Sequence, residues 1–258
     1  MKTIIRNTLL LLSLVVLPLG LTSCNSSGYS LGDASVAIAT VKSLSSSDFY
    51  ILLDGGQKLY PSAPIMHNYK VIDGQRILVN FTLLSGEYNE YDHLIKINSL
   101  ENILTKGVDV LENEEEDDFG DDPFLISNDK YWPTGMWVSG GYLNIAFVRP
   151  FSMSERHRIS LVKNKLETSP EDEYEHLELR YNTFGDSSSR GYKALVSFNL
   201  NSLELEDKKG LMLKRINPKG EEETIELNFK KEEEEKEKAF VSETRVSTEL
   251  LLDESLVD

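Results

Sequence analysis

The sequence predicts an all-β protein built from two units. Short stretches in which apolar and polar residues alternate recur along the chain, most clearly from Arg76 to Leu84. Turn-forming residues such as Asp54-Gly55-Gly56 and Asp73-Gly74 separate these stretches. Between Glu112 and Asp122, eight of eleven residues are acidic. Such a run is typical of a solvated linker, so we expect it to divide two β units.

Residues 1–23 are typical of a lipoprotein signal peptide. Lys2 and Arg6 form a basic start, and Leu9–Leu19 supplies an apolar core that is too short to span a bilayer. The stretch that follows, Leu21-Thr22-Ser23-Cys24, matches a lipobox, so we expect cleavage before Cys24 and attachment of a diacylglycerol to its thiol. A plain secretory signal would instead leave this sole cysteine of the chain as an unpaired thiol in an oxidising compartment.

The expected lipid at Cys24 anchors the protein to a membrane. Two or three acyl chains hold a protein essentially permanently, and residues 24–33 would form a flexible tether. Asn25-Ser26-Ser27-Gly28 contains no acidic residue, so neither an inner-membrane retention signal nor an acidic signal for surface export is present there. We therefore expect the outer membrane as the location, with the periplasmic face and the cell surface both open.

The charge balance of the chain excludes one class of partner. Its net charge of −16 becomes −18 when the segment carrying Lys2 and Arg6 is removed. Nucleic-acid binding needs a basic footprint, which a chain this acidic does not offer. The same acidity disfavours binding to anionic lipid head groups.

The first β unit is expected over residues 34–110. We predict five strands in it, at Val36–Val41, Phe49–Leu53, Gln57–Tyr60, Arg76–Leu84 and Tyr91–Ile97. After the last strand, Leu100, Ile103 and Leu104 have helical spacing. A short helix is therefore expected over residues 98–106, capped by Asn98 or Ser99 and closed by Gly107.

The second β unit is expected over residues 123–230, after an acidic linker at 111–122. The predicted strands are Tyr142–Val148, Arg158–Lys163, Glu175–Tyr181, Tyr192–Leu200, Leu211–Ile216 and Thr224–Phe229. Asn217-Pro218-Lys219-Gly220 fits a type I turn between the last two. Residues 231–258 begin with a run of Lys and Glu and form a charged C-terminal extension.

Several of these segments together resemble NigD-like lipoproteins. The N-terminal OB-type domain of that family is similar to Phe49–Gly56 (FYILLDGG), Asp73–Phe81 (DGQRILVNF), Tyr91–Leu100 (YDHLIKINSL) and Ile103–Lys106 (ILTK). Its C-terminal β-sandwich domain is similar to Gly141–Phe147 (GYLNIAF) and Leu177–Asp186 (LELRYNTFGD). The resemblance implies a small OB-like barrel followed by a β-sandwich, in an envelope lipoprotein for which a bacteriocin-immunity role was proposed. It implies no catalytic residue and no cofactor.

The residues themselves indicate no catalytic or metal site. No Gly-x-Ser-x-Gly elbow is present, and no pair among the four histidines has a metal-ligand spacing. His176 and Glu178 share one face of a predicted strand, which leaves an unrecognised hydrolase as an alternative; the plainer interpretation is a solvated polar face. The acidic run lacks the pattern of an EF-hand loop, so we expect at most weak Ca²⁺ binding there.

Three aromatic residues form the remaining candidate site. Tyr131, Trp132 and Trp137 are close in sequence and offer ring faces for a sugar or a peptide, although a plug between the domains is the plainer interpretation. We therefore predict a non-enzymatic, cofactor-free and metal-free envelope lipoprotein that binds a protein partner, with a glycan as the alternative ligand and no nucleic-acid partner.

Overall fold

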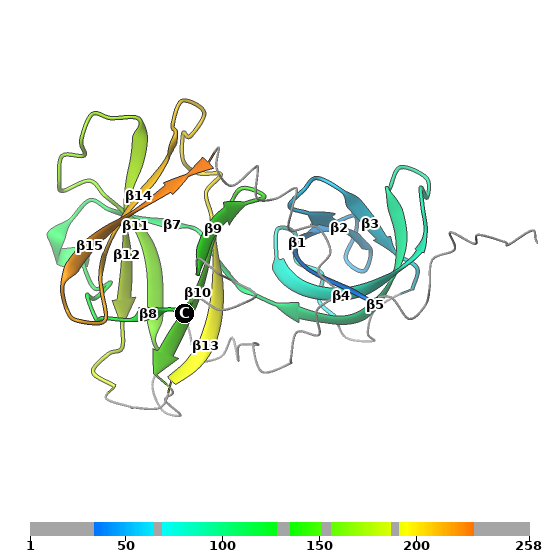
Figure 1. Ribbon diagram of the computed structural model, residues 1–258, viewed down its shortest axis with the longest axis horizontal. Helices are drawn as coiled ribbons and strands as arrows, with labels where there is room; N and C mark the ends of the chain where they lie inside the picture. Colours follow the sequence, from blue (N-terminus) through cyan, green and yellow to red (C-terminus); the bar gives the residue numbers. More distant parts are fainter. Residues whose placement is uncertain (1–33, 64–68, 128–134, 151–155, 187–190, 230–258) are drawn as a thin grey trace, which may run out of the picture. The chain divides into compact units, whose positions relative to one another are not determined.

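The computed structural model describes residues 34–63, 69–127, 135–150, 156–186 and 191–229. Within these ranges the chain is almost entirely β, because fifteen strands and one short 3₁₀ helix, η1 (Glu114–Glu116), make up its regular structure (Figure 1). The all-β class predicted from the alternating pattern is thus confirmed. No helix in the described ranges is both long and apolar enough to cross a bilayer.

The first five strands close into a barrel in the order β1-β2-β3-β5-β4. They are β1 (Ser35–Ser43), β2 (Phe49–Leu53), β3 (Lys58–Pro61), β4 (Arg76–Ser85) and β5 (His93–Asn102). Alternate residues of each strand point inward, as the period-two pattern predicts, and form the barrel core of Ala39, Val41, Phe49, Ile51, Leu53, Leu59, Ile77, Val79, Phe81, Ile95 and Leu100. This is the OB-like barrel that the resemblance implied.

The helix predicted over residues 98–106 is wrong. β5 continues through this stretch to Asn102, where Leu100 pairs with Val79 of β4, and a separate short strand, β6 (Leu104–Lys106), follows. The helical spacing arose because three apolar residues pack in three different places. Leu100 enters the barrel core, Ile103 joins a cluster of residues from barrel and sandwich, and Leu104 packs against the sandwich core.

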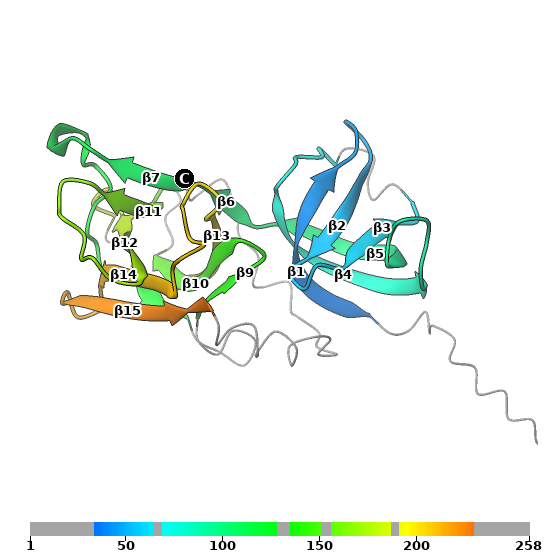
Figure 2. The ribbon, with the colours of Figure 1, turned by 90° about the horizontal axis from the view of Figure 1, so that it is seen from above.

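Two sheets make up the sandwich (Figure 2). Sheet I has the order β6-β13-β10-β8, with β9 also paired to β10, and sheet II has the order β15-β14-β12-β11-β7. Their strands are β7 (Val108–Leu111), β8 (Leu125–Ile126), β9 (Met136–Ser139), β10 (Tyr142–Pro150), β11 (Arg158–Asn164), β12 (Tyr174–Asn182), β13 (Gly191–Asn199), β14 (Gly210–Ile216) and β15 (Glu222–Asn228). The six strands predicted for this unit are all present.

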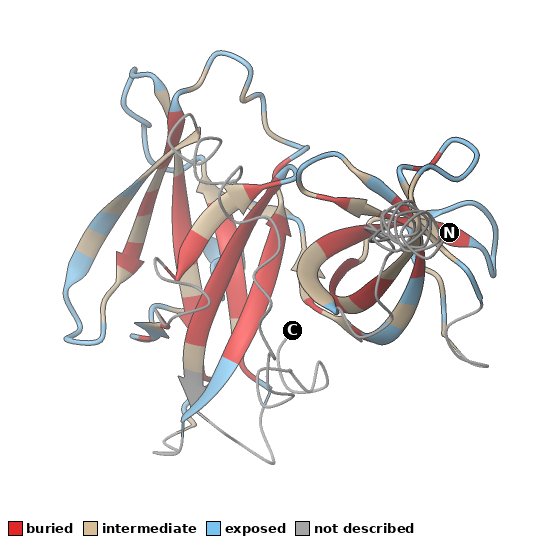
Figure 3. Cartoon of the chain, turned by 45° about the vertical axis from the view of Figure 1, so that its right-hand side comes forward, coloured by how far each residue is buried: buried red, intermediate tan, exposed pale blue. Residues whose placement is uncertain are grey.

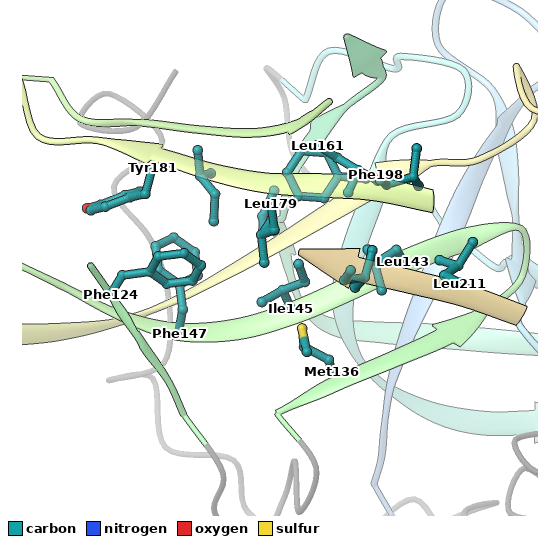
Figure 4. Packing of buried hydrophobic residues seen from close by; sticks show 14 of the residues in the cluster. Phe124, Met136, Leu143, Ile145, Phe147, Leu161, Leu179, Tyr181, Phe198 and Leu211 are labelled. Carbon is teal, nitrogen blue, oxygen red and sulfur yellow. The ribbon is translucent and has the colours of Figure 1, made fainter. Parts of the chain in front are cut away.

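The sandwich core lies between the facing sides of the two sheets. Leu143, Ile145 and Phe147 of β10 meet side chains of sheet II such as Leu161 and Leu179 (Figure 4). At one end, the rings of Phe124, Phe147 and Tyr181 contact one another with centroids 5.3 to 6.0 Å apart. The outer faces of the two sheets point away from this core, toward the barrel or toward solvent.

The acidic run lies inside the sandwich and does not divide the two domains. It connects β7 and β8, both of which are sandwich strands, whereas the chain passes from barrel to sandwich between β5 and β6. Our expectation of a solvated linker at 111–122 therefore differs from the structure. The physical reason is charge pairing, because Arg158 and Arg180 hold this run against β11 and β12 through Asp117, Asp118 and Asp121.

A small apolar cluster joins the barrel to the sandwich. Val36, Ile38 and Leu78 lie on the outer faces of β1 and β4, and they pack with Ala146, Leu195 and Trp137 of sheet I. Leu78, Ala146 and Leu195 are buried, as are most residues of β10 (Figure 3). Strands β1 and β4 are therefore covered on both sides, which explains the apolar residues on both of their faces.

Candidate functional site

A cavity of about 450 Å³ opens on the outer face of sheet II. Strands β12 and β14 alternate here, so Leu177, Leu179, Leu211 and Leu213 point into the core while the residues between them point outward. Three outward residues, Glu178, Arg180 and Lys214, line the cavity floor. Asn164 of β11 and the acidic run complete its wall.

Glu178 is the central group of this cavity. Its side chain is only 8% exposed, and its carboxylate accepts hydrogen bonds from Asn164 Nδ2 at 3.0 Å and Arg180 Nη1 at 2.8 Å. Lys214 Nζ lies 3.2 Å away. Burial by itself raises the pKa of Glu178, but these hydrogen bonds and the charge of Lys214 outweigh it, so the pKa lies below its usual value. Glu178 is therefore held as a carboxylate.

Arg180 connects this carboxylate to the acidic run. Its guanidinium also contacts Asp117 at 3.2 Å and Asp121 at 2.6 Å, and its Nε donates to the carbonyl of Gly120 at 2.9 Å. The surrounding carboxylates raise the pKa of Arg180 although burial opposes them. The charges of the cavity thus pair with one another, an arrangement that fixes a loop onto a sheet.

His176 and Glu178 both line a second, smaller cavity of about 130 Å³, but their hydrogen bonds go to different partners. Both lie on the outer face of β12, as predicted, but His176 Nε2 contacts the carboxylate of Asp172 at 2.9 Å. Glu178 is engaged by the cations and the amide described above. Across the described ranges, no three His, Cys, Asp or Glu side chains are grouped so as to hold a metal ion.

A second histidine is engaged inside the sandwich. His157 is buried, with Nδ1 2.7 Å from the hydroxyl of Tyr181 and Nε2 3.0 Å from a carboxylate oxygen of Asp186. These contacts tie the turn after β12 to the start of β11. Sequence reasoning missed this group, because nothing in the spacing of the three residues relates them.

An enclosed polar site lies where barrel and sandwich meet. Arg76, at the start of β4, is fully buried, and its guanidinium donates to Asp54 at 2.5 and 2.8 Å and to Thr40 at 3.0 Å. Across the interface it reaches Asn144 of β10 at 3.3 Å and lies over the ring of Tyr142, 4.6 Å from the ring centroid. We call this group the Arg76 network.

Sandwich residues complete the Arg76 network. Ser139 donates to Asp54 at 2.5 Å, and Asn144 contacts both Ser139 and Ser197. The turn at Gly140 comes so close that a Cβ there would lie 2.5 Å from a carboxylate oxygen of Asp54, and its φ of +58° also favours glycine. The hydroxyl of Tyr142 donates to the carbonyl of Gly74 at 3.1 Å, and burial raises its pKa although Arg76 opposes this. The network joins the two domains.

The sequence contains one signal for the Arg76 network. Arg76 begins a strand whose two faces both carry apolar residues, and such a strand is covered on both sides. An arginine in that position must be buried with a partner. Its main partner, Asp54, was assigned only to a turn, and the 22 residues that separate the two conceal the pairing.

The predicted site residues have mixed outcomes. Leu21, Thr22, Ser23 and Cys24 lie outside the described residues, as do Tyr131 and Trp132. Trp137, on β9, packs half-buried in the apolar cluster between barrel and sandwich. That is the position expected of a plug between domains. The aromatic platform for a glycan therefore stays a prediction that rests on Tyr131 and Trp132.

Comparisons with known proteins agree with this architecture. The NigD-like N-terminal OB domain matches residues 38–103, and the NigD-like C-terminal beta sandwich domain matches residues 107–229. No curated protein sequence matches the chain.

Similar solved structures come from Bacteroides and Parabacteroides species. One is a putative toxin-related protein from Parabacteroides distasonis, with 31% identity and a TM-score of 0.63, covering 81% of this chain and 100% of its own. A protein of unknown function from Bacteroides vulgatus has 24% identity and a TM-score of 0.65, covering 87% of this chain and 100% of its own. A NigD-like immunity protein from Bacteroides caccae has 18% identity and a TM-score of 0.53, covering 77% of this chain and 93% of its own. With both of its domains matched in order, this chain belongs to the NigD-like family.

Proposed function

We propose that this protein is a non-enzymatic lipoprotein of the bacterial cell envelope that binds a protein partner in an immunity-type role. The observation that carries the proposal is family membership through both domains, together with 31% identity to a protein described as toxin-related. A protein described as a NigD-like immunity protein has the same fold. The partner of an immunity-type protein is itself a protein.

The charged cavity supports a binding role over catalysis. A general acid or base works when its proton can move, and its pKa then lies near the working pH. The pKa of Glu178 is displaced in the opposite direction, below the usual range of a carboxyl, by Asn164, Arg180 and Lys214. His176 lines a small cavity together with Glu178, but its Nε2 is hydrogen-bonded to Asp172.

The proposed anchor is a lipid on Cys24, and the proposed location is the outer membrane. The lipobox Leu21-Thr22-Ser23-Cys24 motivates both, since the only thiol of the chain follows an apolar core of signal-peptide length. Membrane attachment through a lipid would leave the two β domains free to meet a partner at the membrane surface.

Metabolic labelling with an alkyne fatty acid tests the anchor. We expect the wild-type protein to carry the label and to sediment with outer membranes, and the Cys24→Ser variant to carry none. Ser26→Ala is the matched control, because it changes a neighbouring small residue and leaves the thiol in place. Equal labelling of wild type and Cys24→Ser would refute lipidation at this residue.

Crosslinking in intact cells tests the binding role. We expect a specific protein to be captured by the wild-type chain, and we expect a deletion strain to change its sensitivity to bacteriocins from related strains. Complementation with the wild-type gene should restore the original sensitivity. Capture of no specific protein by the wild-type chain, together with unchanged sensitivity of the deletion strain, would overturn the proposal.

A further inference from the structure

Four tyrosine rings form a continuous row on the outside of the barrel. Tyr60 of β3 stacks on Tyr88 and Tyr91, with ring centroids 5.7 and 4.8 Å away. Tyr50 of β2 contacts Tyr91 at 5.5 Å. The order of rings is therefore Tyr88, Tyr60, Tyr91 and Tyr50, and we call this group the tyrosine row. No sequence motif had indicated it.

Strand alternation places the row on the surface. Tyr50 lies between the inward-facing Phe49 and Ile51, and Tyr60 follows the inward-facing Leu59, so both rings point away from the barrel core. Tyr88 and Tyr91 pair with each other across a tight turn that holds Asn89 at a φ of +53°. The exposed fraction is 38% for Tyr88 at one end of the row and 8% for Tyr91 within it.

Carboxylates surround these rings. Asp48 accepts a hydrogen bond from the hydroxyl of Tyr60 at 3.2 Å, and the turn carries Glu87 and Glu90, both exposed. Neither glutamate forms an ion pair with any described residue. Burial raises the pKa of Tyr91, and the charges of Glu90 and Asp48 raise it further. Lys42 and Lys58 stand on the same outer face of the strands.

The row occupies the part of this fold that is suited to binding. In an OB barrel, ligands bind on the face of the second and third strands and between the loops that join strands one to two and four to five. Tyr50 and Tyr60 lie on those two strands, Asp48 lies in the first loop, and Tyr88 and Tyr91 lie in the second. Aromatic faces beside carboxylates attract Lys and Arg side chains through cation–π and ionic interactions.

We propose that the tyrosine row is the surface through which the barrel binds a basic segment of a polypeptide partner. An arginine or lysine side chain would lie against the exposed ring of Tyr88, with Glu87 and Glu90 balancing its charge. The backbone of the segment would follow the row toward Tyr50. This inference rests on the proposed binding role and adds the site and the chemical class of the partner.

Peptide binding to the purified full chain tests the site. The probe is a short synthetic peptide of alternating arginine and glycine with a fluorescent label, and its neutral counterpart carries glutamine in place of arginine. We expect Tyr88→Ala to weaken binding of the arginine peptide about tenfold. We expect Glu90→Gln to weaken it about threefold.

Tyr192→Ala is the matched control, because Tyr192 has nearly the same exposure, 37%, but lies on β13 of the sandwich. It should leave binding unchanged, and all three variants should keep the thermal midpoint of the wild type. Equal losses for Tyr88→Ala and Tyr192→Ala would refute the site. If the glutamine peptide binds as tightly as the arginine peptide, the partner is not basic. If the chain self-associates and Tyr88→Ala abolishes this, the partner is a second copy of the chain and the proposal of a basic partner is refuted.

A photo-crosslinking amino acid placed at position 88 or 192 in intact cells separates this inference from the proposed function. Capture of one protein from position 88 and not from 192 supports the inference. Capture from 192 alone refutes the tyrosine row and leaves the binding role standing. No capture from either position, with unchanged bacteriocin sensitivity in the deletion strain, overturns both.

Discussion

Arg76 of the barrel and Arg180 of the sandwich both lie on β-strands and both bind carboxylates, yet their surroundings differ. Arg180 contacts three carboxylates, of which that of Asp121 is 63% exposed. Within the described part of the chain, Arg76 contacts only that of Asp54, but its side chain is fully buried and the carboxylate is 16% exposed. Arg180 therefore has more ion pairs, two of them to partly or largely exposed carboxylates and one to the buried Glu178, whereas the guanidinium of Arg76 is itself fully buried.

The difference indicates that the burial of an arginine, more than its number of ion pairs, decides how much it contributes to holding the structure together. An exposed pair is screened by water and contributes little, while removal of one partner from a buried pair leaves an uncompensated charge. We therefore interpret the Arg76 network as the connection that fixes the barrel to the sandwich. Arg180 holds the acidic run on β12, which is a contact within the sandwich.

The largest effect is expected from Asp54→Ala. It leaves the buried guanidinium of Arg76 without its carboxylate, and we expect a loss of about 3–5 kcal/mol in the free energy of unfolding. Urea denaturation of the purified chain measures it. Asp54→Asn, which keeps the shape and part of the hydrogen bonding, should lose less. If Asp54→Ala unfolds at the same urea concentration as Glu112→Ala, a change in an exposed pair with Lys165, the assignment is wrong.

A smaller, pH-dependent effect is expected from Glu178→Gln. The folded-state pKa of Glu178 is lowered, so its contribution is complete above the unfolded value near 4.5 and is lost as the pH falls through the folded value. We expect a loss of about 2 kcal/mol at neutral pH. Stability measured from pH 7 to pH 3 should show the variant and the wild type converging below about pH 4.5. A constant difference across that range would contradict the role of charge here.

Arg180→Ala should lower stability by about as much as Glu178→Gln, about 2 kcal/mol, because it removes a hydrogen-bonded cation from the buried carboxylate of Glu178. Its main consequence is local, because the contacts to Asp117, Gly120 and Asp121 are lost. Hydrogen exchange should become faster in residues 112–122 and stay unchanged in the barrel strands. Unaltered exchange in the acidic run would show that Arg158, through Asp118, holds it without Arg180.

The smallest expected effect is a shift in the fluorescence emission of Trp137. It compares the two arginines directly. The Trp137 indole packs in the apolar cluster shared by barrel and sandwich. In a Trp132→Phe background, Trp137 is the only tryptophan. We expect its emission to shift to the red in Asp54→Ala and to stay in place in Arg180→Ala. A shift of equal size in both would mean that the Arg76 network does not govern this interface.

Local pattern predicted the strands well because side-chain direction in a strand depends only on parity. Ile77, Val79 and Phe81 point into the barrel as the alternation from Arg76 to Leu84 indicates. Long-range pairing has no such local signature. The spacing of Leu100, Ile103 and Leu104 resembles that of a helix because each side chain packs against a different part of the structure. The acidic run resembles a linker in the sequence because its partners Arg158 and Arg180 lie about 40 to 60 residues further along the chain.

The sequence by itself determined the all-β class, the positions of most strands, the family, the strong acidity and the expectation of a lipid at Cys24, since each depends on residue type and near neighbours. Only the tertiary structure decided which polar residues meet. The Arg76 network, the cavity around Glu178 and the tyrosine row each combine segments far apart in the chain, brought together by barrel closure and sheet pairing. Burial and charge pairing depend on distances in space, and spacing along the chain does not contain them.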